Sequence, residues 1–111
     1  MSDCEAIDCL LKALAHPVRR QILRALAEPE HYFAEQQHPF DVGVCAGMID
    51  QLTGLSQSSN SGHLAALQKA GLISGRKVGQ WIFYQRNEDA IAALLQALKK
   101  QLYPTLQESG V

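Results

Sequence analysis

The sequence has no long hydrophobic run. Its longest uninterrupted apolar stretch, Ala90–Leu95, has six residues, whereas a membrane-spanning helix needs about 20. The amino terminus, Met1–Glu5, is acidic where a secretion signal would be basic, and no apolar segment follows it. We therefore expect a cytoplasmic protein without a membrane partner.

Cysteine is scarce, and the common signatures of enzymes are missing. Cys4, Cys9 and Cys45 are an odd number, which argues against a structural disulfide framework and leaves metal binding or thiol chemistry open. The sequence has no phosphate-binding loop and no dinucleotide-binding glycine motif. Gly54–Ser58 misses the nucleophile-elbow pattern of hydrolases at its last position, and 111 residues are too few for that fold. We do not expect an enzyme.

The formal net charge is only −1, but the charges are unevenly distributed. Residues 1–55 contain four bases and eight acids, whereas residues 56–111 contain six bases and three acids. The stretch 56–86 contains Lys69, Arg76, Lys77 and Arg86 and no acid. Such a basic block indicates binding to nucleic acid, although a solvated surface patch would have the same composition.

The chain is long enough for one domain, over residues 1–111, and 47% apolar residues suffice for a core. Apolar residues spaced i, i+3, i+4, i+7 predict a first helix over about 5–15. His16 is expected to end it, and a second helix is expected from Pro17 to about Ala27. The polar stretch 28–43 is expected to be a long loop with at most a short helical turn, either functional or a tolerated surface insertion.

Residues 44–70 have the spacing of a helix-turn-helix. We expect a helix over Val44–Thr53, a left-handed glycine at Gly54, and a second helix over about 56–70 with Ser56 as its N-cap.

A β-hairpin is expected over about 72–86, because the second of its two runs is rich in strand-forming residues. A last helix over about 88–102 follows, with Asn87 as its N-cap. The predicted fold is mainly α with a small β-hairpin, in the order α-α-α-α-β-β-α. This order is that of a winged helix-turn-helix, in which the hairpin is the wing.

The second helix of the helix-turn-helix begins with small polar side chains, which suit contacts with phosphates and base edges. Basic side chains in the hairpin would neutralise phosphates. We predict that the following residues contact double-stranded DNA: Ser56, Gln57, Ser58, Ser59, Asn60, Ser61, His63, Arg76, Lys77 and Gln80.

Three segments together resemble the ArsR/SmtB family of bacterial winged-helix repressors. Leu11–Leu23 resembles that family's first two helices, Gly54–Ile73 its turn and recognition helix, and Gly79–Tyr84 its wing. The resemblance covers about residues 7–102 and implies a homodimeric repressor that an inducer releases from its promoter. Two residues depart from the family pattern. Asn60 stands where a β-branched residue is usual, so it would either contact a base or phosphate or be a poorly buried polar group. Gly62 stands where His or Arg is frequent.

Apolar stripes on the first and last helices support dimerisation independently, because they exceed what a small core needs. The resemblance places the dimer interface on these two helices, and the residues expected there are Ile7, Leu10, Leu11, Leu14, Ile91, Leu94, Leu95, Leu98 and Leu102. Symmetric pairing would place two recognition helices roughly 34 Å apart, which matches an inverted-repeat operator.

The resemblance also suggests metal sites, which are incomplete here. Residues 88–102 contain no histidine, so the family's site on the last helix is absent. Cys45 matches the first cysteine of a Cys-Val-Cys pattern, but Gly47 replaces the second. In some relatives the partner subunit's N-terminal cysteines fill this gap, a role that Cys4 and Cys9 would take. Three thiolates would suit a thiophilic metal or metalloid ion such as arsenite.

The same thiols fit other interpretations. Cys45, near a helix N-terminus, is expected to be reactive, and would form a disulfide with Cys9 or react with an electrophile. The thiols would otherwise be inert, as in a winged-helix regulator without thiol or metal sensing. Zinc binding by His31, His38 and Cys45 is a weaker hypothesis, because their spacing is no known ligand pattern. A module that contacts only proteins, without binding DNA, remains a further alternative.

Overall fold

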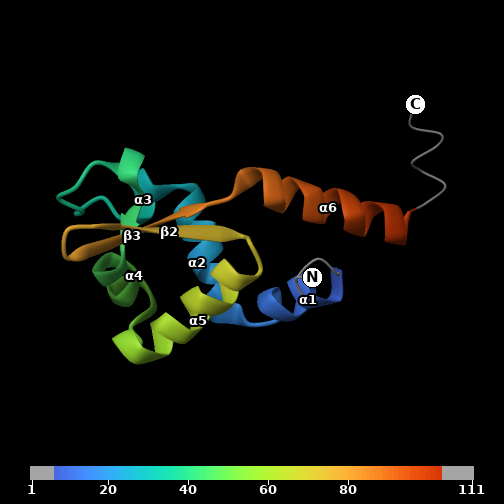
Figure 1. The fold of residues 1–111 in the computed structure, drawn as a ribbon, viewed down its shortest axis with the longest axis horizontal. Helices are drawn as coiled ribbons and strands as arrows, with labels where there is room; N and C mark the ends of the chain where they lie inside the picture. Colours follow the sequence, from blue (N-terminus) through green and yellow to red (C-terminus); the bar gives the residue numbers. More distant parts are fainter. Residues whose placement is uncertain (1–6, 104–111) are drawn as a thin grey trace.

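The computed structural model describes residues 7–103, and Cys4 lies outside them. Its elements, drawn in Figure 1, are α1 (Ile7–Leu14), α2 (Pro17–Ala27), the short α3 (Pro29–Tyr32), the 3-10 turn η2 (Phe40–Val42), β1 (Val44–Cys45), α4 (Ala46–Thr53), α5 (Gln57–Lys69), β2 (Ile73–Val78), β3 (Trp81–Arg86) and α6 (Glu88–Leu102). The predicted winged helix-turn-helix fold is confirmed, with α4 and α5 as the helix-turn-helix and β2–β3 as the wing.

The expected helix over Val44–Thr53 was wrong at its start. Val44 and Cys45 form a short strand that pairs antiparallel with Tyr84 and Phe83 of β3, giving a three-stranded sheet in the order β1-β3-β2. Gly43 makes this approach possible, because its φ is 109° and an added Cβ would lie 2.7 Å from the Tyr84 carbonyl oxygen.

The stretch 28–43 is more ordered than a plain loop. It contains α3 and η2, and the Gln36 side chain ties it to the sheet. The Gln36 Nε2 group donates to the carbonyls of His38, at 3.0 Å, and Gly43, at 3.1 Å, while Gln36 Oε1 accepts from the Cys45 N–H at 2.8 Å. These bonds hold the segment against the start of β1.

The junction between α1 and α2 also differs from expectation. His16 does not simply end the first helix: it is the N-cap of α2, and its Nδ1 accepts from the Val18 N–H at 3.3 Å. Pro17 follows in the first helical position, where a missing N–H has no cost.

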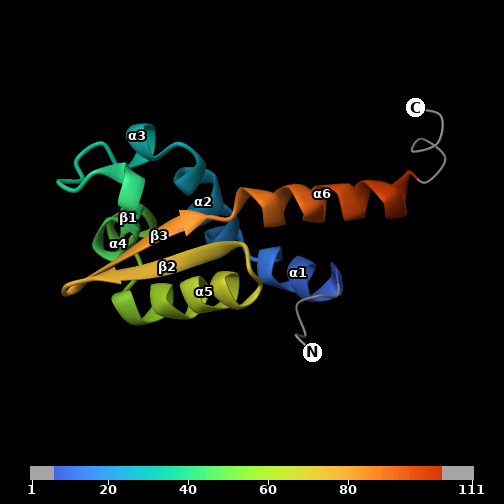
Figure 2. The same cartoon turned by 45° about the horizontal axis from the view of Figure 1, so that its top comes forward.

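The core lies between α2, α4, α5 and the sheet. Its fully buried large side chains are Ile22, Phe33, Ile49, Leu67, Leu72 and Phe83. Helix α6 leaves this core and projects beyond it, with α1 beside its first half (Figures 1 and 2). None of the helices within residues 7–103 combines the length and the apolar character that a membrane span needs.

Candidate nucleic-acid interface

The turn between α4 and α5 has the two features that the sequence predicts. Gly54 takes a left-handed conformation, with φ 71°, and its N–H donates to the Asp50 carbonyl. The Ser56 Oγ accepts from the Ser59 N–H at 3.1 Å and so caps α5. The Ser56 side chain therefore fixes the start of α5 while it remains exposed.

Asn60 lies in the interior, which corrects its assignment to the DNA-contacting set. Its side chain is only 1% exposed and is the one buried polar residue of the described chain. Asn60 Nδ2 donates to Asp50 Oδ1 at 2.7 Å, and Asn60 Oδ1 accepts from the Thr53 hydroxyl at 3.0 Å. Asn60 thus fastens α5 to α4, and both ends of its amide are used within the protein.

The outward face of α5 keeps the other predicted polar residues. Gln57, Ser58, Ser59 and Ser61 are exposed, and the first turn of α5 contains no acid. Gly62 lies on the same face, where an added Cβ would meet nothing within 4 Å. The fold itself therefore does not require glycine at this position.

His63 is only partly exposed and contacts the α1–α2 junction. Its Nδ1 accepts from Arg19 Nε at 3.1 Å, and its ring centroid lies 4.4 Å from that of His16. Burial, followed by the nearby His16 and Arg19, lowers the pKa of His63. The side chain of His63, which we predicted to contact DNA, is therefore only partly accessible. It also links the middle of α5 to α2.

The wing carries the basic residues. Arg76, Lys77 and Gln80 are all exposed on or beside the hairpin turn. At the base of the hairpin, Tyr84 packs against Gly75, whose added Cβ would lie 3.0 Å from the Tyr84 ring. Burial, and then the Asp50 carboxylate, raise the pKa of Tyr84. The wing strand β3 also packs against α4.

Two of the three predicted thiols, Cys9 and Cys45, lie within the described residues. Cys9 lies on α1 and Cys45 immediately before α4, and both are free. Figures 1 and 2 both show α4 at one end of the molecule and α1 well away from it, beyond α5 and beside the first half of α6. A disulfide between Cys9 and Cys45 of one chain is therefore not formed. Within the described residues, no three His, Cys, Asp or Glu side chains form a metal-binding group, so His31, His38 and Cys45 do not make a zinc site.

The residues expected at the dimer interface divide into two sets. The first packs on the protomer's own core, with Leu94 buried and the others half-buried: Ile7, Leu10, Leu14, Ile91, Leu94 and Leu98. The second is exposed, with Leu11 at 37%, Leu95 at 60% and Leu102 at 67%. The exposed set leaves an apolar surface along α1 and α6.

Sequence reasoning missed three residues that shape this site. Asp50 and Thr53 hold Asn60, and Arg19 holds His63. Each partner lies on a different helix from the residue it binds. Periodicity within one helix therefore cannot predict which two residues form the hydrogen bond. The one available sign was a polar residue at a position that the helix turns toward the core.

No protein-family model matches the chain. It is 36% identical over 95 residues to an uncharacterized HTH-type transcriptional regulator, YbzH of Bacillus subtilis, covering 84% of this chain and 95% of that protein. It is 34% identical over 88 residues to the putative arsenical resistance operon repressor ArsR2 of Halobacterium salinarum, covering 78% of this chain and 65% of that protein.

A solved structure gives the same result. The solution structure of a homodimeric winged helix-turn-helix DNA-binding domain from Mycobacterium bovis, a possible ArsR-family transcriptional regulator, is 26% identical. The match covers 100% of this chain and 94% of that one, with a TM-score of 0.59.

Proposed function

Because the chain belongs to the ArsR family of winged helix-turn-helix transcriptional regulators, we propose that it is a dimeric repressor that binds an inverted-repeat operator and leaves it when an inducer acts on Cys45. Relatives that are named regulators support the DNA-binding part of this proposal and give no indication of enzymatic activity.

One observation carries the proposal: the amino-terminal half of α5 presents only small neutral polar side chains to the outside. Gln57, Ser58 and Ser61 project from this half, and no acid lies there to repel phosphate. The Gln side-chain amide can both donate to and accept from the edge of adenine, and a Ser hydroxyl can bond either a donor or an acceptor on a base edge. In the proposed complex, this face of α5 lies in the major groove. Asn60 would position the helix without touching the duplex.

The wing supplies the electrostatic part of the proposed interface. Arg76 and Lys77 are exposed and free of salt bridges to other described residues. Their charges are therefore available for phosphates, and each contact would release counterions and make binding depend on salt. Gln80, at the hairpin turn, would reach the flanking groove.

The exposed apolar surface on α1 and α6 fits a second copy of the chain. Leu95 and Leu102 project from α6 where it extends past the core, and solvent-exposed leucines in such a row are a liability in a monomer. The Mycobacterium bovis relative is a homodimer. In our proposal, pairing of α1 and α6 about a two-fold axis presents two copies of α5 to the two halves of an inverted repeat.

Cys45 is the thiol that we propose as the inducer's target. It is 8% exposed and lines a cavity of about 340 Å³ beside the first turn of α4. A small oxidant or electrophile in that cavity would reach the sulfur, and the added group would press on α4. A metalloid held by Cys9 and Cys45 of a single chain does not fit, because Cys9 lies on α1 and Cys45 directly before α4, and these two helices lie apart in the fold.

Replacement of Cys45 tests this proposal. We expect Cys45→Ser to bind the operator normally and to stay bound when an oxidant or trivalent arsenic is added, whereas wild-type protein dissociates. Cys9→Ser is the matched control and should dissociate like the wild type. Normal release of the Cys45→Ser protein in an electrophoretic mobility-shift assay would remove this residue from the mechanism.

A further inference from the structure

Two cavities beside α4 share part of their lining. They have volumes of about 330 and 340 Å³, and both are lined by Glu35, Met48 and Gln51. We call these two cavities together the α4 groove. Volumes above roughly 300 Å³ are typical of small-molecule sites. Neither the proposed DNA contacts on α5 nor the proposed dimer surface uses this groove, but its second cavity is the one beside Cys45 in which the proposed inducer would act.

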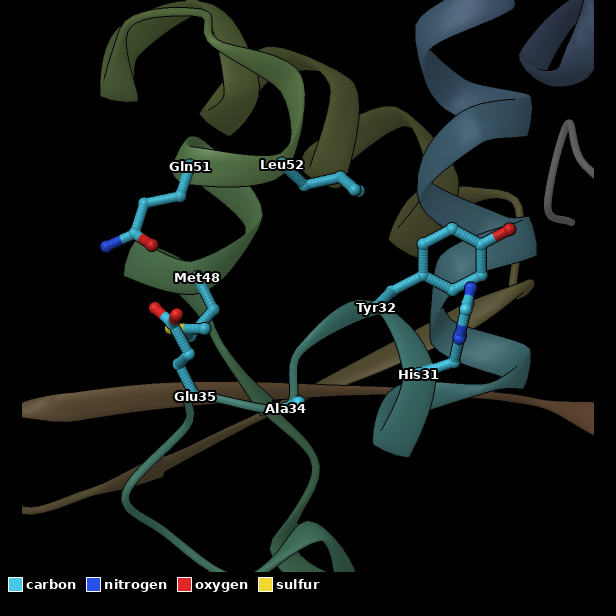
Figure 3. A pocket seen from close by; sticks show the side chains of 7 residues that line it. All are labelled: His31, Tyr32, Ala34, Glu35, Met48, Gln51 and Leu52. Atoms are coloured by element: carbon cyan, nitrogen blue, oxygen red, sulfur yellow. The ribbon is translucent and has the colours of Figure 1, made fainter.

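Each of the two cavities has an exposed aromatic side chain in its lining. In Figure 3, α3 carries one wall of the first cavity, with Tyr32, and α4 carries the facing wall, with Met48 and Gln51. Trp81 lines the second cavity, with its ring 5.3 Å from that of His38. Tyr32 is 37% exposed and Trp81 is 43% exposed, so both rings keep a free surface. Met48, a flexible and polarizable side chain, lines both cavities.

The charge of the groove has one sign. Counting histidine as neutral, Glu35 is the one charged residue lining either cavity, and it lines both. The salt bridges of the described residues are Arg24–Glu28 and Arg86–Glu88, so Glu35 has no ionic partner there. No Lys or Arg lines the groove that would bind an anion.

From these observations we propose that the α4 groove binds a lipophilic organic cation. Its positive charge lies beside the Glu35 carboxylate, and its apolar body lies against Met48 and the exposed aromatic rings. A cation beside Trp or Tyr is also attracted by the ring's electron-rich face. A metal ion does not fit, since the described residues provide no group of three His, Cys, Asp or Glu ligands.

Occupancy of the groove would act on the DNA-binding elements. Trp81 begins the wing strand β3, and Cys45 caps α4, so a bound cation contacts both parts of the helix-turn-helix and wing unit. This consequence for DNA binding rests on the proposed function. Binding of the cation does not, and it is measured on the free protein.

The test uses two probes of the same shape and opposite charge, tetraphenylphosphonium and tetraphenylborate. Trp81 is the sole tryptophan, so its fluorescence reports on the groove directly. We expect tetraphenylphosphonium to change the fluorescence in a saturable manner and tetraphenylborate to give no saturable change. Equal binding of the two probes, or binding of neither, would overturn the proposal.

Three variants locate the site. Glu35→Gln should weaken tetraphenylphosphonium binding about fivefold, the effect of one exposed ion pair. Glu30→Gln is its control, because Glu30 is exposed on α3 and lines neither cavity. Gly47→Leu should block binding without unfolding the protein, since an added Cβ there meets nothing within 4 Å and the side chain would fill the second cavity. Unchanged affinity in both Glu35→Gln and Gly47→Leu would place the probe elsewhere and refute the groove.

Discussion

Replacement of Asn60 by alanine should strongly destabilise the protein, because this buried amide joins the two helices of the helix-turn-helix. The hydrogen bond from Asn60 to the Asp50 carboxylate, at 2.7 Å, has a charged acceptor, and such bonds contribute about 1.5–3 kcal/mol to the free energy of unfolding. The bond from the Thr53 hydroxyl, at 3.0 Å, contributes about 1 kcal/mol. Alanine regains roughly 0.6 kcal/mol through its higher helix propensity. We therefore expect a loss of about 2–3 kcal/mol in the free energy of unfolding.

Urea denaturation at a fixed protein concentration measures this loss. Fixed concentration matters because the stability of the proposed dimer would depend on it. Ser61→Ala is the matched control: Ser61 is the exposed neighbour on α5, and its replacement should change stability by less than about 0.5 kcal/mol. A double-mutant cycle with Asp50→Ala should give a coupling energy of about 1–2 kcal/mol. Strict additivity, or an Asn60→Ala protein as stable as the wild type, would refute this role.

Three further predictions concern the interface. Gln57→Ala should reduce the free energy of operator binding by about 1–3 kcal/mol and that of binding to a random duplex by much less, as measured by fluorescence anisotropy. Equal losses on both duplexes would contradict base reading by α5. Arg76→Ala should weaken binding to every duplex and reduce the salt slope by about 1 for each lost phosphate contact, and an unchanged slope would contradict the phosphate role. Because burial and the neighbouring cations lower the pKa of His63 in the folded protein, the unfolded chain takes up this proton first as the pH falls below about 6.5. Stability should therefore drop between pH 7.5 and 5, less steeply in His63→Gln, and an identical pH profile in that variant would count against the His63 contacts.

The overall fold followed from local signals in the sequence. Gly54, Ser56 and Asn87 mark helix ends through chemistry that acts over a few residues, and each has the predicted role. The short strand at Val44–Cys45 was missed because its partner, β3, lies about forty residues further along the chain. Two residues are too few to show an alternating pattern.

The candidate site was predictable in its residue types but not in every role. Small polar residues at the start of α5 indicate an outward face, and most of them lie there. Asn60 was the exception, and the sign of its burial was that it occupies a position where the resembling family usually has a β-branched residue. Only the three-dimensional structure shows that Asp50 and Thr53 compensate it. The α4 groove depends likewise on residues from three separate segments.

The central claim is that two copies of the chain hold a duplex while α5 reads its bases. Titration of the purified protein into the DNA upstream of its own gene, and into a scrambled duplex of equal length at low ionic strength, tests it most directly. The account predicts a complex of two protomers per operator, about 10³-fold or more tighter than the complex with scrambled DNA. A protein that sediments as a single protomer and binds neither duplex would contradict it.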